Sequence, residues 1–199
     1  MSSPQLKVVI PAEKRAGEAR VATVPDVVGK LIRAGVSVEV ESGAGDRSQA
    51  TDEDFRKAGA TVSASVDLAT ADVVLSVNAL EPAVLAKLKK GALTISFLSP
   101  TASLESISAA KNAGVTAFSL ELVPRISRAQ SMDALTSQAL CAGYRAALVA
   151  AELSPRFFPL LMTAAGTVTP ANVVVLGAGV AGLQAIATAR RLGAVVSAY

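Results

Sequence analysis

A glycine-rich turn near the end of the chain has the residue spacing of a phosphate-binding loop. An apolar, β-branched run at 173–176 is followed by Gly177-Ala178-Gly179-Val180-Ala181-Gly182 and then by a helical pattern to Leu192. In such a turn the first glycine allows a tight reversal, the second lets backbone amides approach a pyrophosphate, and the third lets the helix press against the sheet. The flanking strand and helix give the glycines the setting that a dinucleotide site requires. The residues predicted to bind the dinucleotide here are Gly177, Gly179, Val180 and Gly182.

A second set of chemically capable residues lies in the polar segment, which we define as PRISRAQSMDAL at 124–135. It has no strand periodicity and indicates a polar loop. Guanidinium, amide and carboxylate groups can fix the orientation of a planar ring by hydrogen bonds, without acid–base chemistry. The side chains that carry these groups are Arg125, Arg128, Gln130 and Asp133, and Ser127 adds a hydroxyl; all five are predicted to bind the cofactor.

The composition excludes several kinds of active site. The chain has no histidine and one cysteine, Cys141, so it lacks the usual general base and the commonest metal ligands. We therefore predict no metal site and exclude a serine-hydrolase triad. The net charge is +3, the basic residues are scattered, and aromatic residues make up only 4% of the chain. This pattern argues against nucleic-acid binding.

An uncharged stretch at 157–189 is long enough to be considered as a membrane span. Pro159, Pro170, Asn172 and four glycines interrupt it, and a strand-like run meets the glycine turn inside it. We interpret the stretch as a buried strand and helix of a soluble fold, and we predict no membrane insertion of this segment.

Upstream of the polar segment, β-branched apolar runs alternate with helical patterns that end at glycine. This alternation is typical of a parallel sheet with crossover helices. We expect five strands at 7–10, 36–40, 72–77, 93–97 and 115–119, and helices at 25–34, 52–58, 82–88 and 104–112. Thr51 is expected to cap the second helix, and the expected helix terminators are Gly35, Gly59, Gly91 and Gly114.

A longer helical pattern covers 134–152 and is followed by Pro155 and Pro159. Its apolar residues recur every three or four positions, and we expect them to pack between domains; they are Leu135, Ala139, Ala142, Ala146 and Val149. The predicted organisation is therefore a first domain at 1–134, a connecting helix and linker at 135–160, and the start of a second domain at 161–199.

The predicted fold class is α/β, with two Rossmann-like, doubly wound parallel-sheet domains of which the second is truncated. After the glycine turn the sequence provides one helix and one strand, at 194–198. The acidic residue that would bind a ribose belongs about 20 residues after the first glycine, at Tyr199 or beyond it. We therefore expect an N-terminal fragment whose second domain exposes apolar surface.

Three stretches together closely resemble the NAD(H)-binding domain of proton-translocating nicotinamide nucleotide transhydrogenase. They are the polar segment, GYRA at 143–146 and TAAGTVTPANVVVLGAGVAGLQAIATARRLGA at 163–194, and the similarity extends to EKRAGEARVATVP near the start. The resemblance implies direct hydride transfer from NADH, bound to this chain, to NADP⁺ bound on a separate domain. Because the partner domains are absent, we expect the fragment to be inactive alone.

The resemblance also assigns roles within the polar segment. Arg125, Gln130 and Asp133 match a family loop that embraces the nicotinamide end of NAD(H), and Arg125 and Asp133 would hold carboxamide or ribose groups. Gln130 would face the incoming NADP(H), and Gln130 and Asp133 are the predicted catalytic residues. The family usually has serine where this chain has Thr136, which keeps the hydroxyl and is predicted to bind NAD(H) as well.

Two alternatives remain open. Alanine dehydrogenase is similar in architecture and shares the Arg20-Val21-Ala22 context, but that family places a lysine at Asn78 and a histidine at Ser99. Reductive amination requires proton transfer, and a site without that lysine and histidine has few side chains that could donate the proton. Hydride transfer between two nicotinamides needs no proton donor from the protein. The other alternative is a non-catalytic nucleotide-binding or dimerisation fragment.

The resemblance further implies a homodimer that works with the NADP-binding and membrane proton-channel domains of the transhydrogenase. It implies a peripheral location at the cytoplasmic or mitochondrial-matrix face of an energy-transducing membrane.

Overall fold

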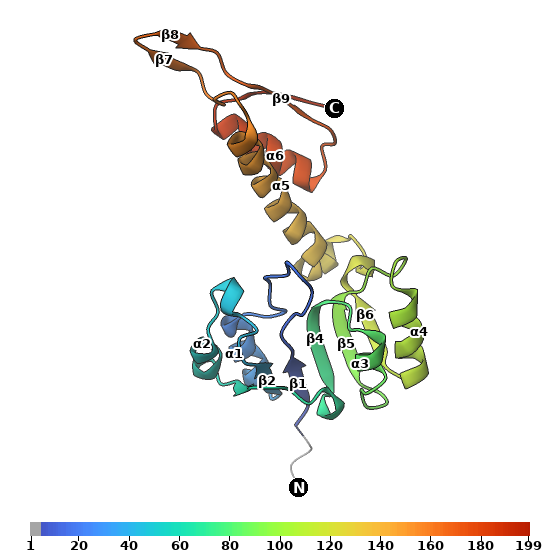
Figure 1. Ribbon diagram of the computed structural model, residues 1–199. Helices are drawn as coiled ribbons and strands as arrows, with labels where there is room; N and C mark the ends of the chain where they lie inside the picture. Colours follow the sequence, from blue (N-terminus) through green and yellow to red (C-terminus); the bar gives the residue numbers. More distant parts are fainter. Residues whose placement is uncertain (1–4) are drawn as a thin grey trace. The chain divides into compact units, whose positions relative to one another are not determined.

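The computed structural model describes residues 5–199, which form two compact units (Figure 1). The first unit ends at Pro124, and the second runs from Arg125 to Tyr199. The division precedes position 134, where the sequence suggested a boundary. The polar segment from Arg125 onward and the long helix after it therefore belong to the second unit.

The first unit is built on a parallel sheet of six strands in the order β3-β2-β1-β4-β5-β6. This is the strand order of a Rossmann-type sheet, so the predicted α/β fold class is confirmed. Five of the strands lie where they were expected, within one residue; the sixth, β3, was not predicted. The strands are β1 (Lys7–Ile10), β2 (Ser37–Glu41), β3 (Thr61–Ser63), β4 (Val73–Asn78), β5 (Leu93–Phe97) and β6 (Thr116–Ser119).

Helices cover both faces of this sheet (Figure 1). Successive side chains of a strand point to opposite faces, and β1 follows this rule. Val8 and Ile10 pack with α1 and α2, around the fully buried Phe55, whereas Val9 packs with α3 and α4. The sheet is therefore doubly wound, as expected. The helices are α1 (Pro25–Arg33), α2 (Asp52–Lys57), α3 (Pro82–Leu85) and α4 (Leu104–Ala113), with short 3₁₀ turns η1 (Asp46–Ser48), η2 (Leu68–Thr70) and η3 (Leu120–Leu122).

The predicted cap of α2 is confirmed. The Asp54 N–H donates to the Thr51 hydroxyl at 3.2 Å, and the Asp54 carboxylate accepts the Thr51 N–H at 3.0 Å. This reciprocal pair satisfies two backbone donors that would otherwise lack partners at the start of the helix.

The second unit begins with the polar segment and ends with the glycine turn and the helix and strand that follow it. Its two parallel strands pair in register from Asn172 with Val195 to Val175 with Ala198. A short antiparallel hairpin, which the sequence did not predict, precedes them. The elements are η4 (Ser127–Met132), α5 (Ala134–Leu153), β7 (Leu161–Thr163), β8 (Gly166–Val168), β9 (Asn172–Val175), α6 (Val180–Arg191) and β10 (Val195–Ala198).

Small residues at intervals of four form the contact between α5 and α6. The buried and half-buried members of the two rows are Ala139, Gly143, Ala147 and Ala151 on α5, and Ala181, Ala185 and Ala189 on α6. Rows with this spacing interdigitate when two helices pack closely. The expected face with Ala142 and Ala146 is wrong, because both are exposed. The smallest residue, Gly143, lies on the neighbouring face and allows the closest approach.

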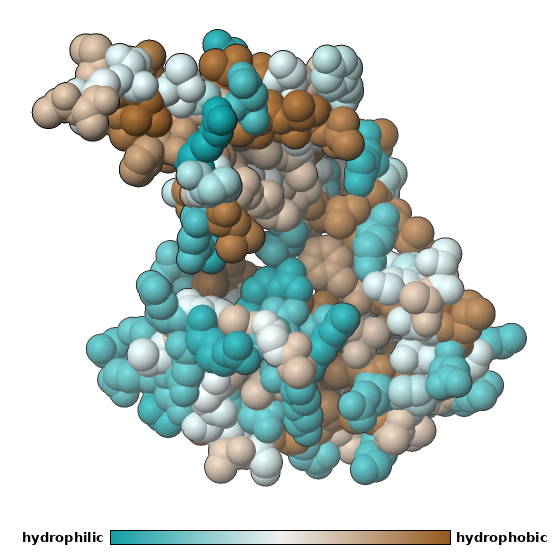
Figure 2. All heavy atoms as spheres, turned by 45° about the horizontal axis from the view of Figure 1, so that its top comes forward, coloured by the Kyte–Doolittle hydropathy of each residue, from teal (hydrophilic) through white to brown (hydrophobic). Residues whose placement is uncertain are grey.

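Strand β9 is less buried than its apolar sequence suggested. Val174 in β9 is 61% exposed, and Leu176, which follows the strand, is 83% exposed. The apolar cluster with α5 and α6 includes Val173 and Val196 but not Val174. Figure 2 shows apolar side chains at the surface of this unit, in the upper part of the view. The expectation that the second domain exposes apolar surface is thus confirmed. Within residues 5–199, no helix has the length and hydropathy needed to cross a bilayer.

Candidate functional site

The glycine turn joins β9 to α6 and adopts a backbone conformation that glycine favours. Gly177 has φ of +99°, in the region where a side chain would be strained. Its N–H donates to the carbonyl of Tyr199 at 2.7 Å, which ties the turn to the end of β10. The first position of the predicted pattern therefore has the geometry that the tight turn requires.

The other two glycines of the turn have opposite surroundings. A Cβ on Gly182 would lie 1.8 Å from the Gly177 carbonyl oxygen, so α6 presses directly on the turn. A Cβ on Gly179 would meet no atom of the described residues within 4 Å. Gly182 is thus required for packing, whereas Gly179 borders open space that an approaching ligand can use.

The backbone amides at the start of α6 directly follow Gly179 in the chain. The first intrahelical bond of α6 joins the Leu183 N–H to the Gly179 carbonyl at 2.8 Å, and no side chain caps the helix. The N–H groups of residues 180–182 therefore have no partner inside the helix. Unpaired amides at the positive end of a helix dipole can bind an anionic group such as a pyrophosphate. Binding at Gly177, Gly179, Val180 and Gly182 stays a prediction.

The polar segment forms the 3₁₀ helix η4, which leads directly into α5. Only Ala129 is buried within η4. The remaining predicted ligand side chains are exposed, and none donates or accepts a hydrogen bond among the described residues: Arg125, Ser127, Arg128 and Gln130. They are accessible to a ligand from solvent.

Asp133 is differently placed, because its carboxylate caps α5. One oxygen accepts the Thr136 N–H at 2.8 Å, and the other accepts the Thr136 hydroxyl at 2.6 Å. These bonds, from the hydroxyl first and then the backbone, lower the pKa of Asp133, and the Arg125 charge adds to the effect. Both predicted binding residues, Asp133 and Thr136, are thus engaged with each other at the start of the helix.

A further polar cluster, which sequence analysis did not identify, lies at the carboxyl edge of the six-stranded sheet. The Glu13 carboxylate accepts the Val77 N–H at 2.5 Å and the Asn78 amide at 2.9 Å. Asn78 also donates to Glu18 at 3.1 Å and accepts from Arg15 at 3.2 Å. Asn78 is therefore the centre of a network that joins two acidic side chains and one basic side chain. The alanine dehydrogenase alternative would require a lysine at this position.

Glu18 and Arg20 form a two-pronged ion pair in this cluster. Arg20 donates to the two carboxylate oxygens at 2.7 and 2.6 Å, and its guanidinium carbon lies 5.9 Å from the centre of the Phe97 ring. The hydrogen bond from Arg20 is the largest cause that lowers the pKa of Glu18 from 4.5 to about 2. The Glu18 side chain is only 8% exposed.

We expect Glu18→Gln to lower the free energy of unfolding of the first unit by about 2 kcal/mol at pH 7. The depressed pKa means that the ionised form stabilises the fold above the ordinary pKa of 4.5, and that this contribution is lost as the pH falls towards 2. Urea unfolding at several pH values would measure the difference. A difference that stayed constant from pH 7 to about pH 2.5 would contradict the assignment to the ion pair.

Ser99 follows β5 and is one of two described non-glycine residues with positive φ, at +49°. Its N–H donates to the Glu121 carboxylate at 2.8 Å, and the Leu98 N–H donates to the same carboxylate at 3.0 Å. At this position the alanine dehydrogenase alternative would need a histidine. This chain has instead the short side chain of Ser99, whose backbone is held by the Glu121 carboxylate.

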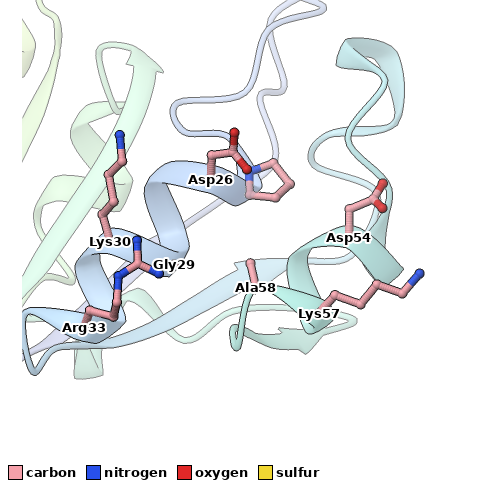
Figure 3. Close-up of a pocket in the computed structure, with 8 residues that line it drawn as sticks. Asp26, Gly29, Lys30, Arg33, Asp54, Lys57 and Ala58 are labelled. Atoms are coloured by element: carbon pink, nitrogen blue, oxygen red, sulfur yellow. The ribbon is translucent and has the colours of Figure 1, made fainter.

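A groove of about 540 Å³ lies between α1 and α2 of the first unit (Figure 3). Its lining mixes two acidic side chains, Asp26 and Asp54, with three basic ones, Lys30, Arg33 and Lys57. In Figure 3 Lys30 and Lys57 point in different directions. The Asp54 carboxylate accepts a hydrogen bond from the Thr51 hydroxyl at 2.6 Å. The acidic and basic side chains together do not make a uniformly positive surface, so the groove is not a candidate site for a phosphate group. Among the described residues, no cluster of His, Cys, Asp and Glu has the form of a metal site.

The doubly wound sheet and the strand–glycine turn–helix unit define an α/β protein of the Rossmann type. A family model described as "Alanine dehydrogenase/PNT, N-terminal domain" matches residues 9–142, and the model of the C-terminal domain of the same family matches residues 146–199. The chain belongs to the alanine dehydrogenase/PNT family.

Individual relatives confirm the resemblance to transhydrogenase. The chain is 49% identical, over 97% of its length, to an NAD(P) transhydrogenase alpha-subunit protein from Rhodospirillum rubrum. A solved transhydrogenase from Sinorhizobium meliloti matches 96% of the chain with a TM-score of 0.93 and 50% identity, over 58% of its own length. A solved L-alanine dehydrogenase matches 95% of the chain with a TM-score of 0.82 and 30% identity, over 53% of its own length. The chain spans only part of these curated transhydrogenase relatives, from 37% of the length of a Haemophilus influenzae transhydrogenase alpha subunit to 52% for the R. rubrum protein.

Proposed function

We propose that this chain is the NAD(H)-binding portion of a proton-translocating transhydrogenase. The observation that carries the proposal is the glycine turn, in which Gly179 borders open space beside the unpaired amides of residues 180–182. This donor set fits the pyrophosphate of a dinucleotide. The names of the relatives, NAD(P) transhydrogenase and transhydrogenase, supply the reaction class.

In the proposed reaction a hydride leaves C4 of the nicotinamide of NADH with its electron pair and forms a C–H bond at C4 of the nicotinamide of NADP⁺. The products are NAD⁺ and NADPH, and no proton is taken up or released at the reacting carbons. The protein's task is therefore to hold two rings in a productive geometry. The glycine turn would bind the pyrophosphate of NADH, and η4 would orient its nicotinamide.

Within η4 and just before it, the exposed side chains of Arg125, Ser127 and Arg128 are available to bind carboxamide and ribose groups. Gln130 is exposed and would face the incoming NADP⁺. Asp133 and Thr136 would act together, because the hydroxyl of Thr136 fixes the carboxylate at 2.6 Å. In this view Asp133 contributes by holding the start of α5, and any contact with the nicotinamide would compete with its cap.

Three features favour this function over alanine dehydrogenase, the other activity named in the family. The identity is higher for the R. rubrum transhydrogenase relative, at 49%, than for a Mycobacterium tuberculosis alanine dehydrogenase, at 36%. Asn78 and Ser99 stand at the positions of the lysine and the histidine of that enzyme's site. The 199 residues also contain no histidine, which is the commonest proton donor near neutral pH.

The partners in this proposal are a second copy of the chain, an NADP-binding domain and a membrane proton-channel domain. The chain would lie peripherally at the cytoplasmic or mitochondrial-matrix face of the membrane. Residues 1–199 alone would be inactive, because the reaction needs NADP⁺ held by the partner domain.

The test is an assay of two reactions with the full chain as it is expressed in the cell. Mixed with an NADP-binding partner domain, it is expected to transfer hydride from NADH to a spectrally distinct NADP⁺ analogue. With pyruvate and ammonia in place of the analogue, NADH oxidation is expected to stay at background. Alanine formation would instead assign the protein to the dehydrogenase branch, and absence of both reactions despite NADH binding would favour a non-catalytic module.

A further inference from the structure

The contact between α5 and α6 is closest at Gly143. A Cβ built on Gly143 would lie 2.0 Å from the Ala181 carbonyl oxygen and 2.8 Å from the Ala181 carbonyl carbon. Both atoms belong to backbone, so no side-chain rotation can make room. Gly143 is buried, and the next members of the same row, Ala147 and Ala151, continue the contact with α6 in one apolar cluster.

The residue that Gly143 touches belongs to the glycine turn. Ala181 lies between Gly179, which precedes α6, and Gly182, whose Cα presses on Gly177. The N–H of Ala181 is one of the three unpaired amides at the start of α6. Any displacement of Ala181 therefore moves the donors proposed to bind the pyrophosphate.

The same helix carries the polar segment at its N-terminal end. Asp133 caps α5, and its N–H donates to the Gln130 carbonyl at 3.2 Å, so η4 is fixed to the start of α5. Gly143 is ten residues further along, which is about 15 Å at 1.5 Å per residue. A single rigid helix thus connects the two regions of the proposed dinucleotide site.

We propose that Gly143 is a positioning residue that sets the distance and angle between the glycine turn and η4. This inference rests on the proposed function, in which the glycine turn and η4 bind the two ends of one NADH molecule. Helix α5 connects these two regions. Gly143 would not touch the ligand. It would act by letting α6 lie against α5 at a separation that no other residue permits.

The test is Gly143→Ala in the full chain as it is expressed in the cell, with Ala146→Ser as the matched control on the exposed face. The added methyl must move from 2.0 Å to at least 3.0 Å from the Ala181 oxygen, a shift of about 1 Å. Because Gly182 presses on Gly177, the turn should move with α6 as one body. A ligand that spans both the turn and η4 is then mismatched, whereas a ligand that uses only the turn is not.

Two probes separate these cases: NADH, and ADP-ribose, which has the pyrophosphate but no nicotinamide. We expect Gly143→Ala to weaken NADH at least tenfold and ADP-ribose less than threefold, with Ala146→Ser unchanged for both. Equal losses for the two ligands, or no loss for either, would overturn the positioning role. Failure of the unsubstituted chain to bind either probe would instead refute the proposed function.

Thermal unfolding followed by circular dichroism reports whether Gly143→Ala retains its fold. If Gly143→Ala is not folded, Ala147→Gly provides the test, because this substitution removes a methyl group from the same row and loosens the helix contact without a steric clash. The ratio of NADH to ADP-ribose affinity should then shift in the same direction by two- to fivefold, and an unchanged ratio would overturn the proposal.

Discussion

Gly182→Ala is expected to abolish measurable NADH binding and to lower the free energy of unfolding of the second unit by about 3 kcal/mol. The added Cβ would lie 1.8 Å from the Gly177 carbonyl oxygen, and Gly177 is itself held at φ of +99° by the turn. The clash can be relieved only by moving α6 away from the turn. Such a movement disrupts the turn and the array of amides together. Urea unfolding and titration of NADH fluorescence would measure the two effects.

Gly179→Ala is the matched control, because it adds the same methyl three residues away. The new Cβ would meet no described atom within 4 Å, and Gly179 has φ of −75°, which alanine adopts readily. We expect the free energy of unfolding to stay within about 0.5 kcal/mol of the original value. NADH affinity should nevertheless fall at least tenfold, because the methyl fills the space next to the amides. Unchanged affinity in Gly179→Ala would mean that the ligand does not approach this turn.

The regular elements of the first unit could be predicted because local propensity, hydrophobic pattern and helix-ending glycines indicate the same elements. β1, β2, β4, β5 and β6 are apolar or β-branched runs, and a glycine ends each of several helices between them. β3 gave no such signal, since Thr61–Ser63 has three residues, none of them fully buried. Its place at the sheet edge depends on pairing with β2, which is a long-range contact that local sequence does not encode.

The second unit shows a different limit. The glycine pattern at 177–182 could be predicted, because Gly177 has a positive φ and Gly182 packs too closely for a Cβ, and few other residues tolerate either condition. The buried face of α5 could not, since hydropathy favours Ala142 over Gly143, whereas the burial of Gly143 depends on its contact with α6. The signal that was present but missed is the interval of four, which runs through Gly143 on α5 and Ala181 on α6. In a helix contact made of small residues, size and interval are more informative than hydropathy.

The candidate site shows the same division. Arg125 and Gln130 are exposed, and the ligand roles that the family resemblance implied for them stay predictions. Asp133 was assigned the same role, yet its carboxylate caps α5 through Thr136. Aspartate is a preferred residue at the position just before a helix, where it accepts a backbone N–H two or three residues further on, and the sequence already placed Asp133 there. The cluster around Asn78 was missed because Glu13, Glu18 and Asn78 are brought together only when the sheet forms.

Gln130→Asn is expected to slow hydride transfer between ten- and a hundredfold while leaving NADH affinity within threefold. Gln130 is exposed on η4, and its side-chain amide makes no hydrogen bond to the described residues, so its loss should not affect folding. Asparagine keeps the amide but draws it back by one methylene, about 1.5 Å, from the ring that approaches from the partner domain. Misplacement of that size can reduce a rate about a hundredfold when the two reactants must meet in one geometry.

The kinetic signature distinguishes this role from a structural one. If Gln130 orients the two nicotinamides only as they react, kcat for hydride transfer should fall while KM for NADH stays nearly constant. Ser131→Ala, at the exposed neighbouring position of η4, is the control and should leave both constants unchanged. Single-turnover measurements with saturating nucleotides would isolate the hydride step from product release. A loss of NADH affinity that accounted for the whole rate effect would show that Gln130 binds NADH in its ground state, and that the rings are aligned by another region of the site.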